Sequence, residues 1–80
     1  MKTIITQGLE DDQVKDIRAD FISAHLLRKR IREILHDKVE TTRATARKEV
    51  NYENPAWPYQ QAGYLEREKA LLEIISLLED

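Results

Sequence analysis

The chain has 80 residues, a net charge of −2 and no cysteine. This length allows one domain at most, and the lack of cysteine excludes disulfides and thiolate-bound metals. The sequence contains no run of about 18 apolar residues, so we expect no membrane span. Glu, Lys, Arg, Leu, Ile and Ala dominate without the alternation of a strand, which predicts an all-α fold.

Charge divides the chain into three segments. Residues 1–27 carry a net charge of −2, residues 28–48 carry +5 and residues 49–80 carry −5. A basic block between acidic flanks favours pairing between the second and third segments. The sign pattern therefore predicts that these two segments lie side by side.

Residues 1–20 predict an irregular or short-helical N-terminal arm. A short extended piece is expected at Thr3–Thr6, and Gly8 should interrupt any regular element there. Asp11 or Asp12 is a suitable cap for a short helix. Whether this helix continues into the next one, or bends before it, is left open by the pattern.

The second element is a long basic helix over residues 21–50, about 45 Å in length at 1.5 Å per residue. Asp20 or Ser23 can cap its start. Asn51 suits its end, and residues 51–57 form a connection rich in proline and aromatic residues. Its apolar positions recur at spacings of three and four and are Ala24, Leu27, Ile31, Ile34, Leu35, Val39, Thr42, Ala46 and Val50.

A third element, an acidic and apolar helix, is expected over residues 58–79, because Pro58 suits the first turn of a helix. Together the two long helices predict a long antiparallel helical hairpin. Residues 70–78 contain seven apolar residues in nine, an arc too wide for one facing helix to cover. The surplus predicts a homo-oligomer interface that comprises Leu71, Leu72, Ile74, Ile75, Leu77 and Leu78.

Two alternatives to self-association account for the same apolar surplus. The arm can fold back over the third helix through its own apolar residues, which are Ile4, Ile5, Leu9 and Val14. The exposed strip can also be a groove for a different protein.

No constellation of residues predicts catalysis, a metal or a cofactor. Ser23 and Ser76 have no histidine and acid at suggestive spacing. Glu33 and His36 have the E-x-x-H spacing of di-iron bundles, but no second motif accompanies them. We therefore expect a non-enzymatic protein without a cofactor.

The basic block offers possible phosphate contacts at Arg28, Lys29, Arg32, Arg43 and Arg47. The charges of residues 28–32 spread around the helix, and no aromatic residues are interleaved for base stacking. Nucleic-acid binding is therefore a lesser alternative.

Aromatic residues gather around the connection, where they either pack the open end of the hairpin or anchor a partner. They are Tyr52, Trp57, Tyr59 and Tyr64.

A basic amphipathic helix, then Trp57-x-Tyr59-Gln60-x-x-Gly63-Tyr64, then a helix through Ala70 and Leu71, resembles the short helical-hairpin proteins of tailed bacteriophages. The resemblance covers residues 21–79 and brings no catalytic residue with it. It implies a phage origin, association with the virion, and a structural or assembly role with a larger virion component as partner. Because the sequence shows neither a signal peptide nor a membrane span, we expect the protein in the cytoplasm of the host cell. An inhibitor of a host or defence protein is the alternative role.

Overall fold

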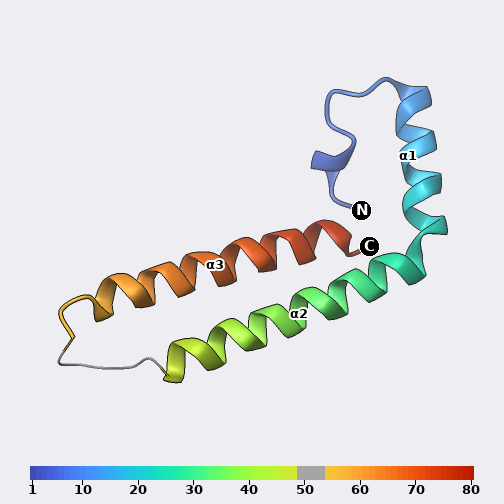
Figure 1. Ribbon diagram of the computed structural model, residues 1–80. Coiled ribbons are helices and arrows are strands. Elements are labelled where there is room, and N and C mark those ends of the chain that lie inside the picture. The colour runs from blue at the N-terminus through green and yellow to red at the C-terminus, as the bar shows by residue number, and fades with distance from the viewer. Residues whose placement is uncertain (49–53) are drawn as a thin grey trace.

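The computed structural model describes residues 1–48 and 54–80. A 3₁₀ helix at Thr3–Ile5 precedes α1 (Asp11–Ser23), α2 (His25–Lys48) and α3 (Trp57–Leu78), and the described residues include no strand. α2 and α3 lie antiparallel and side by side, while α1 turns away from the start of α2 (Figure 1). The predicted all-α fold and long helical hairpin are thus confirmed.

The N-terminal arm is helical where an extended piece was expected. The Thr6 N–H and hydroxyl both donate to the Thr3 carbonyl, at 3.1 and 3.3 Å, so the prediction of extended backbone at Thr3–Thr6 is wrong. Gly8 does interrupt the arm, with a φ of 81° that favours glycine. The N-cap of α1 is Glu10, one residue before the expected Asp11 or Asp12, and its N–H donates to Gln13 Oε1 at 3.2 Å.

A bend at Ala24 separates α1 from α2, so the long helix starts at His25 and not at residue 21. The ψ angle of Ala24 is 19°, far from the helical value of about −42°. The Asp20 carbonyl accepts the Ala24 N–H at 3.0 Å and the Ser23 hydroxyl at 3.1 Å. These bonds end α1. The sequence left open whether the two segments form one helix or two with a bend, and the structure has two helices with a bend.

The other predicted boundaries lie close to the observed ones. α3 starts and ends one residue earlier than expected, with Pro58 in its first turn. Before it, Asn54 accepts the Trp57 N–H at its carbonyl and the Ala56 N–H at its side chain, at 3.0 and 2.9 Å. The expected end of the second helix at Val50, with its cap at Asn51, lies outside the described residues.

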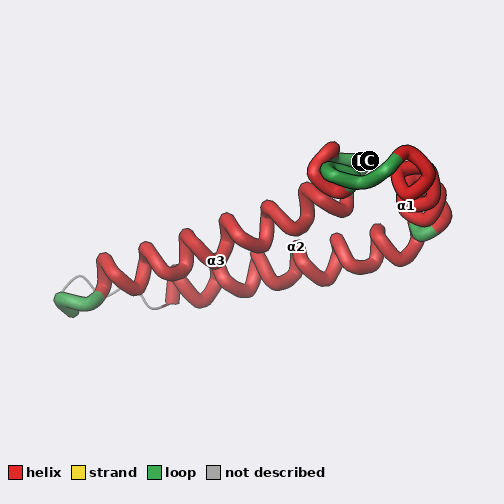
Figure 2. The backbone as a smooth tube through the Cα atoms, turned by 90° about the horizontal axis from the view of Figure 1, so that it is seen from above, coloured by secondary structure: helices red, strands yellow, loops and turns green. Residues whose placement is uncertain are grey.

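The packed core of the hairpin is thin. Val39 and Ile75 are the buried apolar side chains among the described residues, with 2% and 3% of their surface exposed. The molecule measures 58 × 26 × 11 Å, and its radius of gyration is 17.4 Å, against about 12 Å for a compact domain of this length. Figure 2 shows why: two helices lie side by side with α1 at one end, and no described element forms a further layer over them.

Candidate functional site

Arg28 joins α1 to the C-terminal end of α3 at the bend. Its guanidinium lies over the Phe21 ring, 3.8 Å from the centroid, and Nε donates to the Phe21 carbonyl at 2.7 Å. Nη1 donates to the Leu78 carbonyl and contacts the Asp80 carboxylate, both at 3.0 Å. With 6% of its surface exposed, Arg28 holds the last turn of α3, where a helix dipole favours positive charge.

Two more of the five candidate phosphate contacts are also engaged within the chain. Arg32 donates to the Leu78 carbonyl at 2.6 Å. Arg43 pairs with Glu68 at 2.6 Å and with Glu40 at 3.2 Å, and the hydrogen bond that Arg43 donates to Glu68 raises the pKa of Arg43 above its usual value.

Lys29 and Arg47, the remaining two candidates, are exposed on α2. The structure therefore does not gather the five side chains into one basic surface. Most of that positive charge instead ties α2 to α3.

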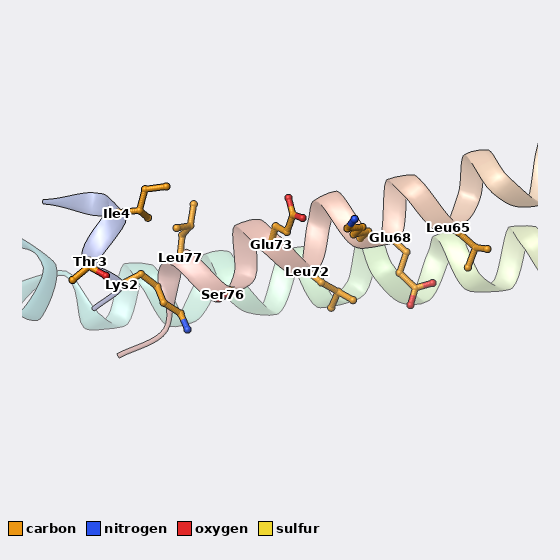
Figure 3. A pocket seen from close by; sticks show the side chains of 10 residues that line it. Lys2, Thr3, Ile4, Leu65, Glu68, Leu72, Glu73, Ser76 and Leu77 are labelled. Atoms are coloured by element: carbon orange, nitrogen blue, oxygen red, sulfur yellow. The ribbon is translucent and has the colours of Figure 1, made fainter. Parts of the chain in front are cut away.

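One long groove runs along α3 on the side that faces the arm, with a volume of about 890 Å³. We call it the arm-side groove. Figure 3 shows its side chains in a row, with arm residues at the end nearest Leu77. Its lining consists of Lys2, Thr3 and Ile4 from the arm and Leu65, Glu68, Lys69, Leu72, Glu73, Ser76 and Leu77 from α3.

The arm folds back toward α3 but covers it incompletely. Ile4 lines the arm-side groove and still exposes most of its own surface. Leu65, at the other end of the groove, is 66% exposed. Neither Lys69 nor Glu73 forms an ion pair within residues 1–48 and 54–80. The arm-side groove therefore combines exposed apolar side chains with free charges of both signs.

The six residues predicted as an oligomer interface are divided by the fold. Ile75 is buried against α2, and Leu71 and Leu78 are half-buried on the same face of α3. Leu72, Ile74 and Leu77 expose 38–46% of their surface. Only the second group remains available to a partner.

The predicted aromatic cluster is also divided. Trp57 and Tyr64 are half-buried, whereas Tyr59 is 82% exposed. Tyr52 lies outside the described residues. Tyr59 is thus the aromatic side chain of α3 that is most accessible to a partner.

A second, smaller pocket of about 190 Å³ lies between α2 and α3. We call it the basic groove; it is lined by Lys38, Thr41, Thr42 and Thr45 of α2 with Tyr64 and Arg67 of α3. It shares no residue with the arm-side groove, and successive residues of a helix turn by about 100°, so Arg67 lies away from Glu68 and Lys69.

Sequence reasoning missed the basic groove. Lys38 and Arg67 are 29 positions apart, so only the hairpin register brings them together. The opposite net charges of the two segments predicted attraction between the helices. A net charge does not show that two like charges, Lys38 and Arg67, meet locally.

In the part of the chain that the structure describes, no group of three His, Asp or Glu side chains is placed to hold a metal ion. Glu33 of the E-x-x-H motif pairs instead with Arg30 at 3.2 Å. No described helix has both the length and the apolar character needed to cross a membrane.

Comparison with known protein families, with curated proteins and with solved structures finds no match to this chain.

Proposed function

We propose that this protein is a non-enzymatic protein–protein interaction module that associates with a second copy of itself through the arm-side groove. The proposal rests on one observation: Leu65, Leu72 and Leu77 are exposed along α3, and the arm covers them incompletely. The accessible surface is 6365 Å², against about 5,000 Å² for a compact protein of this mass. The excess is larger than the roughly 800 Å² that each partner contributes to a standard interface.

The α3 lining of the arm-side groove has the periodicity of a helix-packing seam. Leu65, Lys69, Leu72 and Ser76 follow one another at spacings of four, three and four, which places them on one stripe of α3. A second copy of α3, running antiparallel, can pack along this stripe, because a two-fold interface uses the same surface of both copies.

Charge favours a second copy as the occupant. An antiparallel pairing about a two-fold axis that crosses the arm-side groove at the level of residue 71 places Lys69 beside Glu73 of the second copy, and symmetry repeats the contact. The same register places Leu65 beside Leu77 of the second copy. A face that carries both signs in this order is complementary to itself.

In a phage, which the resemblance implies, such a module would contribute to virion structure or assembly. This finer role is supported by the resemblance alone. The local contacts of Arg28, Arg32 and Arg43 within the chain favour a protein over a nucleic acid as partner, because they leave few free cations on one surface.

Light scattering on the full chain tests self-association. At tens of micromolar we expect a mass of at least twice 9.4 kDa, and Leu65→Glu should lower it to that of the monomer. The matched control is Leu26→Glu, since Leu26 is 70% exposed and Leu65 66% but Leu26 lies outside the arm-side groove.

A monomeric mass for the unmodified chain would overturn the proposal and favour a different protein as partner, as in the inhibitor hypothesis. An equal effect of Leu26→Glu and Leu65→Glu would remove the arm-side groove from the interface. Circular dichroism of each variant shows whether the helices are retained.

A further inference from the structure

The basic groove, on the other side of the hairpin, is lined by two positively charged side chains that have no counterion in the described residues. Lys38 from α2 and Arg67 from α3 line the same pocket. Neither forms an ion pair within the described residues, whereas Arg28, Arg30 and Arg43 all do. Two positive charges held close together repel each other, so an anionic group is the ligand that this pocket favours.

The threonines beside these cations do not compete for the anion. Thr41, Thr42 and Thr45 each donate their hydroxyl to a carbonyl of their own helix at 2.9 Å. Their protons are therefore used locally, and Lys38 and Arg67 are the charged donors of the pocket. Its volume of about 190 Å³ holds several water molecules at ~30 Å³ each, which is room enough for a carboxylate.

An apolar strip continues the basic groove toward the bend. Ile34 lies one turn before Lys38 on α2, and Ile74 lies two turns after Arg67 on α3, each on the same side of its helix. Both isoleucines are exposed. Because the helices are antiparallel, the isoleucines lie at the same end. The groove is therefore cationic toward the connection and apolar toward the bend.

We propose that the basic groove and this apolar strip bind an amphipathic helix of another protein, with a carboxylate near one end and apolar anchors near the other. The strip and the cations are separated by about 6 Å along α2 and about 10 Å along α3. A complementary helix therefore carries Asp or Glu four to seven residues from an apolar anchor. Packing of such a helix between α2 and α3 adds a third helix to the hairpin.

The charges and the apolar strip disfavour two other occupants. A second copy that used this same face would meet Lys38 and Arg67 with the same lining, which contains no carboxylate to pair with them. A nucleic acid would satisfy the cations but leave Ile34 and Ile74 without apolar cover. The inference does not depend on self-association, because it uses residues outside the arm-side groove.

The probe is a synthetic 20-residue amphipathic helix that has leucines on one face and glutamates at the C-terminal half of that face. Its matched control has lysine in place of each glutamate. Calorimetry with the full chain should show binding of the glutamate peptide, and the double variant Lys38→Glu, Arg67→Glu should weaken it about tenfold or more. Ile74→Gln should weaken binding of the glutamate peptide. It should equally weaken binding of a neutral peptide that has glutamine in place of each glutamate.

The control variant Lys29→Glu changes the charge of the same helix on another face and should leave peptide affinity unchanged. Equal binding of the lysine peptide, an equal loss with Lys29→Glu, or no binding of the glutamate peptide would each overturn the proposal. A drop in solution mass for Lys38→Glu, Arg67→Glu would assign the groove to a second copy instead. Binding of a DNA duplex with the same loss would assign it to nucleic acid.

Discussion

Ile74 and Ile75 are neighbours in the chain and identical in chemistry, yet they belong to different parts of the molecule. Ile75 is buried in the hairpin core, where α3 faces α2. Ile74 lies about 100° around the helix from it and is exposed. The same contrast separates Leu71 and Leu78 from Leu65 and Leu72. The composition of α3 thus determines how much apolar surface the helix carries. The position of each residue around the helix axis determines whether that surface packs against α2 or remains accessible to a partner.

The largest expected effect comes from placing a charge on the packed face. Ile75→Asp loses the core contacts of a buried isoleucine and buries a carboxylate, at a cost of at least about 4 kcal/mol, a large share of the stability of a small domain. We expect loss of the helical circular dichroism signal.

Ile74→Asp is the matched control, because it makes the same chemical change one residue away. On an exposed position it should cost only about 0.5 kcal/mol. If both variants unfolded alike, the distinction between the buried and exposed positions of α3 would be wrong.

The next effect concerns the end of the packed face, where Arg28 holds the last turn of α3. Arg28→Met keeps the aliphatic bulk but leaves the Phe21 and Leu78 carbonyls without this donor, at a cost of about 2 kcal/mol. Urea denaturation should show the lower stability. Lys29→Met, on the exposed side of the same helix, should leave the urea midpoint nearly unchanged.

Arg28→Lys sharpens the same test. A lysine keeps the charge but lacks the planar fork that reaches the Phe21 carbonyl, the Leu78 carbonyl and Asp80 together. Lysine should therefore rescue only part of the stability. Full rescue would mean that charge alone, without the hydrogen-bond geometry, holds α3 in place.

A smaller effect is expected from salt on the pairing of two copies through the arm-side groove. Two symmetry-related contacts between Lys69 and Glu73, each worth about 0.3 kcal/mol, correspond to about a threefold change in the dimer dissociation constant. Dilution experiments at low salt and in about 1 M NaCl, where charges are screened, should show this weakening. Tighter association at high salt would show that apolar burial alone drives the contact and would discard the proposed register.

The smallest effect is expected at Arg43, whose pair with Glu68 bridges α2 and α3 at an exposed position. Arg43→Met should lower the melting temperature only slightly, because exposed ion pairs contribute little. Because the pKa of Arg43 is raised above the usual value of arginine, Arg43 stays charged near neutral pH. Its pair with Glu68 should therefore give no change of stability through loss of the arginine charge in that range. A loss equal to that of Arg28→Met would contradict this ranking.

The hairpin was predictable because its signals are local. Apolar spacing identified both long helices, and Pro58 located the start of α3 to within one residue. The bend at Ala24 was not predictable, because the apolar positions continue through it: Phe21, Ala24 and Leu27 keep the spacing of three that one straight helix would also have.

The candidate site was predictable only in part. The apolar surplus of residues 70–78 indicated an exposed strip, but which residues form it depends on the rotation of α3 against α2, and the burial of Ile75 shows that rotation only in the folded chain. The role of Arg28 could not be read from the basic run, because its acceptors belong to residues 21 and 78 and meet only in three dimensions.

Both chain ends of the structure meet at one corner. Met1 and Asp80 line the same small pocket, and Figure 1 shows the two ends beside each other. A donor dye on residue 1 and an acceptor dye on residue 80 would therefore transfer energy efficiently in the folded chain. Detachment of the arm from α3, even with the hairpin intact, would lower that transfer, so a single fluorescence ratio would report whether the arm-side groove is closed at that end or open to a second molecule.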